Sequence, residues 1–85
     1  MVYFVTFYNH NSGMEGKSNL IKYGKRLKEL REKNKLTQAE LAEKIGFSTN
    51  FIGMIERGER NTTTDNIFKI AKALNTSVEH FFKGM

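Results

Sequence analysis

The sequence predicts an all-α fold of five short helices, preceded by an N-terminal arm that is prone to form a β-strand. Three observations lead to this prediction. Apolar residues recur at helical spacing after residue 20, residues suited to helix caps separate the apolar segments, and only short turns join them. Because cysteine is absent, a single small domain must be held together by packing rather than by disulfides.

The first two helices are predicted over residues 20–33 and from about residue 38. Asn34 and Lys35 end the first segment. Thr37 and Glu40 are spaced as a capping box, in which each side chain bonds to the backbone N–H of the other residue. Gly46 is expected to end the second helix, since glycine adopts the left-handed conformation without steric cost. The apolar residues at helical spacing in the first helix are Leu20, Ile21, Leu27 and Leu30.

The last three helices are each preceded by a hydroxyl side chain that is suited to an N-cap. We expect the third helix to run to about Arg57 and the fourth to stop at Asn75. The expected caps are Ser48 for the third helix, Thr63 or Thr64 for the fourth, and Ser77 for the fifth.

Residues 1–19 are predicted to be an extension, and residues 20–85 the folded domain. Residues 1–8 are uncharged, aromatic and β-prone, residues 9–13 suggest a turn, and residues 15–19 suggest a polar linker. A lone strand must pair with something. Three explanations remain open: two copies pair across a dimer axis, the strand packs on its own domain, or translation begins at Met14 and residues 1–13 have no evolved role.

Positive charge is concentrated in residues 17–35. The net charge is +5, and this segment holds eight of the basic residues against only Glu29 and Glu32. Such asymmetry predicts a polyanionic partner. A helix that lies on a membrane surface needs a broad apolar face with aromatic anchors, which residues 20–34 lack. The charge pattern therefore favours nucleic acid over a membrane.

The residues available for catalysis or metal binding are few. His10 and His80 are the only histidines, and no thiolate is available for a metal site. We find no phosphate-binding loop and no plausible grouping of serine, histidine and acid. We therefore expect no enzyme activity, no metal, no cofactor and no small-molecule ligand. No run of residues is apolar enough to span a membrane, and we expect a cytoplasmic protein.

The spacing of five residues predicts a helix-turn-helix unit. Gln38 opens the second helix, and Ala42 supplies the small side chain that two steeply crossing helices need at their contact. Gly46 supplies the turn, while Ile52 and Ile55 anchor the third helix. This arrangement leaves the outer face and the N-terminal end of the third helix free to enter a major groove.

With its flanking residues, the segment from about Leu20 to Phe82 resembles the phage-repressor-like (lambda-repressor/Cro, or XRE) family. The resemblance implies a five-helix lambda-repressor-like DNA-binding domain. Within the family, residues 56–61 followed by Asn66 and Ile67 are most similar to controller proteins of restriction–modification systems. The matching residues are Gly24, Leu27, Leu30, Arg31, Leu36, Thr37, Gln38, Glu40, Leu41, Ala42, Lys44, Gly46, Ser48, Ile52, Ile55, Glu56, Gly58, Ile70, Ala71, Ala73, Leu74, Phe81 and Phe82.

The resemblance also implies roles for individual residues. It pairs Arg31 with Glu56 as a partly buried ion pair between the first and third helices. The residues expected to face base edges are Thr49, Asn50, Gly53 and Met54. The residues expected to contact phosphate are Gln38, Ser48, Arg57, Arg60, Asn61 and Lys35.

Two features of the third helix depart from the simplest expectation. Controller-like proteins commonly carry an arginine at the position of Thr49, so we expect modest base discrimination, sites that favour A·T pairs and a larger contribution from DNA shape. A glycine in mid-helix costs about 1 kcal/mol relative to alanine. Gly53 is explained either by close approach to DNA or by crowding against Phe47 or Phe51.

The C-terminal helix is expected to form a two-fold dimer interface through Val78, Phe81 and Phe82, as in the family. The alternative is that the phenylalanines close the core of the single subunit. A dimer places two recognition helices about 34 Å apart and requires a near-palindromic operator. The predicted function is an autoregulatory, homodimeric regulator that binds double-stranded DNA. The alternative function is an antitoxin-like module that neutralises a partner protein, for which the aromatic residues 1–8 are available.

Overall fold

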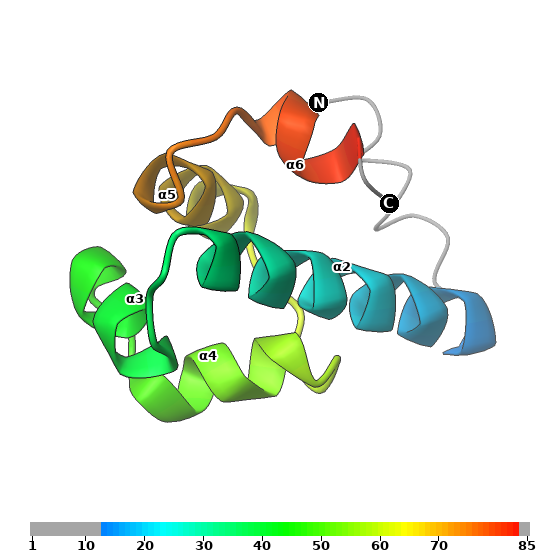
Figure 1. The fold of residues 1–85 in the computed structure, drawn as a ribbon. Helices are drawn as coiled ribbons and strands as arrows, with labels where there is room; N and C mark the ends of the chain where they lie inside the picture. The colour runs from blue at the N-terminus through cyan, green and yellow to red at the C-terminus, as the bar shows by residue number, and fades with distance from the viewer. Residues whose placement is uncertain (1–12, 84–85) are drawn as a thin grey trace.

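The computed structural model describes residues 13–83, and within this part of the chain it contains five α-helices and no strand (Figure 1). The predicted all-α fold is thus confirmed for the described residues. The helices are α2 (Gly13–Lys33), α3 (Gln38–Ile45), α4 (Thr49–Glu56), α5 (Thr64–Ala73) and α6 (Val78–Lys83).

Helix α2 runs through the middle of the molecule, with α4 on one side of it and α6 on the opposite side (Figure 1). Helix α3 packs against both α4 and α5, and α5 packs against α6. The fold therefore separates the surface formed by α4 from the surface formed by α6.

The start of α2 corrects one prediction. The helix begins at Gly13, so residues 15–19 are helical rather than a linker, and the predicted domain boundary falls inside α2. Gly16, Ser18 and Asn19 suggested a loop, but each costs about 1 kcal/mol or less in a helix. The stable helix downstream supplies the nucleus, so extending it avoids the cost of nucleation. The predicted strand and its three explanations concern residues that lie outside the described part, which begins at residue 13.

The predicted helix caps are confirmed. The Thr37 hydroxyl accepts from the Glu40 amide at 3.0 Å, and the Thr37 amide donates to the Glu40 carboxylate at 2.8 Å, which completes the capping box. The hydroxyls of Ser48, Thr63 and Ser77 accept from the third amide beyond them, at 3.0, 3.2 and 3.0 Å. The cap of α5 is Thr63 rather than Thr64.

Four helices are followed within two residues by a residue in the left-handed conformation, which after α4 is Gly58, with a φ of 76°. Gly46 has a φ of 73°, as expected of a glycine after a helix. Lys35 and Asn75 adopt the same conformation, with φ values of 58° and 60°. The chain therefore turns sharply between α2 and α3, between α3 and α4, and between α5 and α6.

Helix α4 is held against α2 by close backbone contact at Gly24. A Cβ atom on Gly24 would lie only 2.3 Å from the carbonyl oxygen of Ile55, so the crossing excludes any larger residue. Ile52 and Ile55 are completely buried, as expected. The remaining buried apolar side chains belong to Tyr23, Leu27, Leu30, Leu41, Ala42, Ile67, Ile70, Ala71, Leu74 and Phe81.

Arg26 connects α2 to the end of α6, which the sequence did not indicate. Its Nε donates to the carbonyl oxygen of Phe81 at 2.7 Å, and its Nη2 donates to that of His80 at 2.9 Å. Basic side chains stabilise the free carbonyl groups at a helix C-terminus. Arg26 thus fixes the last helix on the core, although its charge had suggested only a partner for a polyanion.

Candidate nucleic-acid interface

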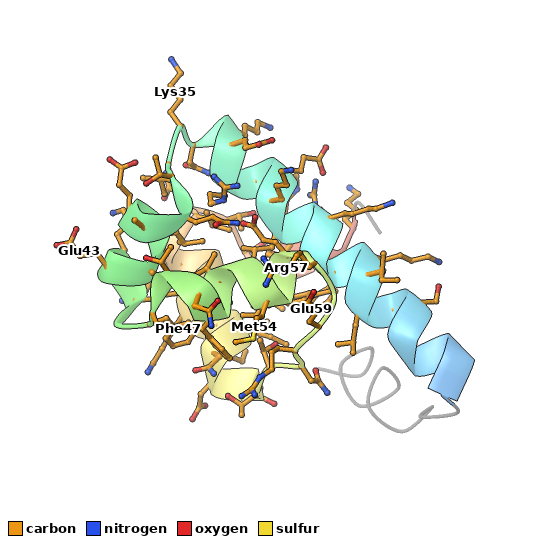
Figure 2. All side chains as sticks on the ribbon, turned by 90° about the horizontal axis from the view of Figure 1, so that it is seen from below. Lys35, Glu43, Phe47, Met54, Arg57 and Glu59 are labelled. Carbon is orange, nitrogen blue, oxygen red and sulfur yellow. The ribbon has the colours of Figure 1, made fainter. Side chains whose placement is uncertain are left out.

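The N-terminal end of α4 is polar and open to solvent. Ser48, Thr49 and Asn50 are all exposed, and the Ser48 cap fixes the direction in which the helix starts. Figure 2 views the molecule with α4 toward the reader. The inner face of the same helix is buried through Ile52 and Ile55, so its outer face is presented by a rigidly held element.

Gly53 and Met54 differ in their surroundings. Gly53 is buried, and a Cβ atom there would lie 3.0 Å from Nη1 of Arg57 and 3.6 Å from Oε1 of Gln38. The side chains nearest to Gly53 are thus those of Arg57 and Gln38 rather than the expected Phe47 or Phe51, and the two phenylalanine rings pack edge-to-face on each other at 5.0 Å. Met54 is partly exposed along the edge of α4 (Figure 2).

The buried carboxylate of Glu56, the last residue of α4, links that helix to α2 and α3. Glu56 accepts from Arg31 Nε at 2.6 Å and from Arg31 Nη2 at 3.1 Å. It also accepts from Gln38 Nε2 at 2.9 Å, while Arg31 Nη1 donates to the carbonyl oxygen of Leu36 at 2.7 Å. The hydrogen bond to Glu56 raises the pKa of Arg31 above its ordinary value. The network fixes α4 relative to the first turn of α3.

This network determines where the side chain of Gln38 lies. The residue lies in the first turn of α3, as expected, and is half-buried. Because its side-chain amide already donates to Glu56, it is held beside α4 rather than extended into solvent.

The chain beyond α4 folds its two arginines back along that helix. Arg57 forms an exposed ion pair with Glu59, at 3.0 Å. This bond raises the pKa of Arg57 and lowers the pKa of Glu59. The guanidinium carbon of Arg60 lies 5.4 Å from the centre of the Phe51 ring, a cation–π distance.

The remaining two residues predicted to contact phosphate are placed differently. Asn61 is exposed, and its Oδ1 accepts from the Thr62 amide at 2.8 Å. Lys35 extends away from α4 at the end of α2 (Figure 2). The structure thus groups Ser48, Arg57, Arg60 and Asn61 with α4 or the loop after it, and leaves Lys35 apart from them.

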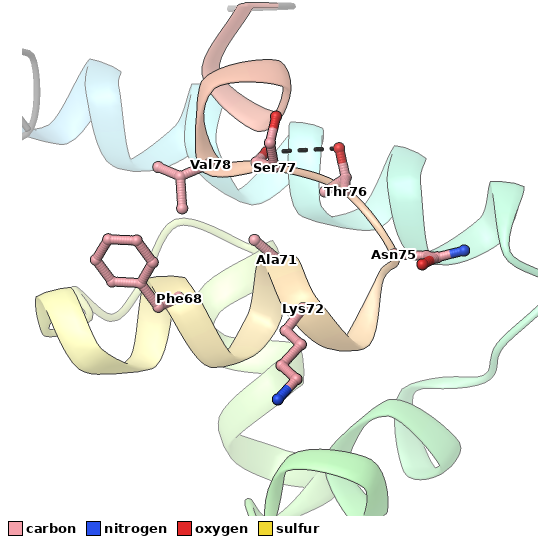
Figure 3. Close-up of a pocket in the computed structure, with 7 residues that line it drawn as sticks. All are labelled: Phe68, Ala71, Lys72, Asn75, Thr76, Ser77 and Val78. Atoms are coloured by element: carbon pink, nitrogen blue, oxygen red, sulfur yellow. Dashed lines mark hydrogen bonds between the residues drawn. The ribbon is translucent and has the colours of Figure 1, made fainter.

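The second exposed surface is a groove between α5 and α6. It has a volume of about 620 Å³, and Phe68 and Val78 face each other across it (Figure 3). Phe68 is 47% exposed. The sequence analysis did not assign Phe68 to an interface. The residue lies next to the buried face of α5 and is not part of that face.

The expected role of Phe81 at a dimer interface is wrong. The side chain has no exposed surface and packs on the Tyr23 ring at 5.2 Å, so it has nothing to present to a partner. It closes the core of the single subunit. Val78 and Phe82 are partly exposed.

Clusters of metal ligands and membrane-spanning helices are both absent from the described part of the chain. Among residues 13–83, no three acidic or histidine side chains are grouped as metal ligands. None of the helices in this part of the chain is long and apolar enough to cross a membrane.

Comparison with known proteins finds one family model, described as helix-turn-helix, that matches residues 27–81. The chain is 51% identical over 45 residues to control protein C.SmaI of Serratia marcescens, covering 53% of this chain and 54% of that protein. It is 40% identical over 57 residues to the HTH-type transcriptional regulator ImmR of Bacillus subtilis, covering 67% of this chain and 45% of that protein. The chain thus spans about half the length of these two relatives.

A solved structure resembles the fold over a larger share of its own length. The restriction–modification controller protein C.AhdI of Aeromonas hydrophila superimposes with a TM-score of 0.74 and 40% sequence identity. The superposition covers 76% of this chain and 98% of C.AhdI.

Proposed function

Because the chain belongs to the helix-turn-helix family, whose members here are transcriptional regulators, we propose that it regulates transcription by placing α4 in the major groove of a specific duplex DNA sequence. One observation carries this proposal. The residues at the start of α4 are exposed and polar, while the opposite face of the helix is fixed in the core. Thr49, Asn50 and Met54 then approach base edges, and Asn50 pairs with adenine through its amide.

The groups around α4 support the phosphate contacts. The N–H groups at the start of α3 and α4 carry partial positive charge, and the Ser48 hydroxyl lies at the start of α4. Arg57, Arg60 and Asn61 follow the helix. Such contacts release counterions from DNA, so added salt weakens binding. Gly53 contributes by its lack of a side chain, which leaves room for Arg57. Gln38 contributes through its backbone N–H group, because its side chain is bonded to Glu56.

The proposal includes a homodimer on a near-palindromic operator. The α5–α6 groove supports it, because Phe68 and Val78 leave apolar surface exposed. The groove lies on the side of the molecule away from α4 (Figures 1 and 3). A second copy seated there leaves both recognition helices free. Likeness to controller proteins favours autoregulation, in which the protein acts on its own operator.

The proposal is tested by replacing Asn50 with alanine. We expect the variant to lose about 1–3 kcal/mol of preference at one base pair of each half-site, because the bidentate contact to adenine is lost. Binding profiles are obtained by selecting duplexes from a random DNA pool with each protein. Glu43→Ala, at an exposed position of α3 (Figure 2), is the control and should keep the original profile. An unchanged profile for Asn50→Ala contradicts the assignment of this residue as a base reader.

A further inference from the structure

The Arg57–Glu59 ion pair lies on the surface that the proposed function turns toward DNA. Nε and Nη2 of Arg57 donate to the two carboxylate oxygens of Glu59 at 3.0 and 3.1 Å. The two side chains are 55% and 53% exposed. An exposed ion pair of this kind contributes little to folding stability, so we expect its main effect to be on DNA binding.

The guanidinium of Arg57 is spread across α4 rather than pointing away from it. Its Nη1 atom lies 3.0 Å from the place that a Cβ atom on Gly53 would occupy. Gln38 borders the same place, with its Oε1 at 3.6 Å. The carboxylate of Glu59 therefore holds the arginine fork beside the C-terminal half of α4 (Figure 2).

A carboxylate and a phosphate offer the same acceptor geometry to a guanidinium. Both accept two parallel N–H bonds from the arginine fork, so the two anions compete for the same edge of Arg57. A phosphate that approached while Glu59 remained in place would also meet its negative charge. Nη1 of Arg57 is turned toward Gly53, so a two-pronged contact with a phosphate uses the Nε and Nη2 edge, which Glu59 occupies, and requires that Glu59 be displaced.

We propose that Glu59 is a positioning residue that holds the Arg57 guanidinium across α4 in the free protein and is exchanged for a DNA phosphate on binding. This inference rests on the proposed function of α4. Glu59 then sets the affinity for DNA. It keeps the Arg57 guanidinium in place, and it lowers the affinity only because its contact with Arg57 must be broken when DNA binds.

The test is a double-mutant cycle of Glu59→Gln and Arg57→Gln. The dissociation constant for one selected duplex is measured by fluorescence anisotropy at a fixed salt concentration. We expect Glu59→Gln to tighten binding by about threefold to fivefold in the original protein, which is the upper part of the range that an exposed ion pair gives. In the Arg57→Gln background the same change should have less than about a twofold effect, because no arginine remains to be released.

Glu43→Gln is the matched control for charge. Glu43 is an exposed glutamate on α3 for which the described part of the chain provides no ion pair, and its replacement changes the net charge by the same amount. If Glu59→Gln tightens binding equally in both Arg57 backgrounds, Glu59 acts only as a repulsive charge and the inference is overturned. An unchanged or weakened affinity for Glu59→Gln overturns it as well.

A second variant and readout keep the test decisive if Arg57→Gln binds too weakly to measure. Arg57→Lys retains the charge but lacks the two-pronged donor, and it should likewise remove most of the Glu59→Gln effect. The Nε–H signal of Arg57 in NMR spectra should shift in the free Glu59→Gln variant, and an unchanged signal contradicts the ion pair. If the original protein binds no duplex, the proposed function itself fails. If it binds and the cycle is additive, only this inference fails.

Discussion

Replacing Arg31 with alanine is expected to lower the free energy of unfolding by about 3–5 kcal/mol, because the carboxylate of Glu56 is then left buried without its charged partner. The Glu56 side chain is only 3% exposed and that of Arg31 9%, so water cannot replace the lost bonds. Gln38 still donates one hydrogen bond, but a neutral amide does not balance the charge. The measurement is denaturant unfolding at neutral pH, followed by circular dichroism.

The size of this effect is large for a domain of about 70 described residues, since small proteins are stable by only about 5–15 kcal/mol. Arg57→Ala is the control, because it removes an ion pair that is more than half exposed and should change the free energy of unfolding far less than Arg31→Ala does. The double replacement of Arg31 and Glu56 by methionine should recover much of the loss, since it removes both buried charges. A loss below about 1 kcal/mol for Arg31→Ala contradicts the role of the network in fixing α4.

Replacing Phe68 with serine is expected to weaken the proposed homodimer by about thirtyfold. Covering the exposed half of a phenylalanine contributes about 1 kcal/mol, and a two-fold interface contains the contact twice, which gives about 2 kcal/mol in total. The dissociation constant of the dimer is measured by analytical ultracentrifugation. Because Phe68 is 47% exposed, the subunit itself should remain folded, which a circular dichroism spectrum checks.

Lys69→Ser is the matched control, since it lies next in α5 and is exposed but leaves the apolar lining of the groove intact. It should leave the dimer unchanged. A weaker dimer should also bind a two-half-site operator less tightly, while its affinity for a single half-site stays the same. A dimer that survives Phe68→Ser places the subunit interface elsewhere on the molecule.

The helix ends after residue 33 were predictable because their signals are local. A hydroxyl three residues before a free amide, as at Thr37 and Ser48, specifies a cap whatever surrounds it. Gly46 specifies a left-handed turn in the same way. The start of α2 carries no such signal, because residues 13–19 extend an already stable helix by about two turns.

The details of the candidate interface depend on contacts between distant residues. Helical periodicity places Phe81 and Phe82 on neighbouring faces but does not decide which is buried: the Tyr23 ring on α2 contacts both, at 5.2 and 6.0 Å, and only Phe81 is completely buried in the folded domain. Gly53 is similar, because the side chains that cover it reach across from Gln38 and Arg57. The ion pair of Arg31 with Glu56 was inferred from a family resemblance, since the two residues are 25 positions apart.

The measurement that tests the central claim most directly is NMR mapping of backbone amide signals as duplex DNA is added to the full chain. If the outer face of α4 enters the groove, the largest shifts fall on Thr49 and Asn50, on residues 57–61 and on the first turn of α3, while the amides along α5 stay in place. Shifts confined to the α5–α6 groove, or no shifts at all with a duplex selected from a random pool, contradict the account.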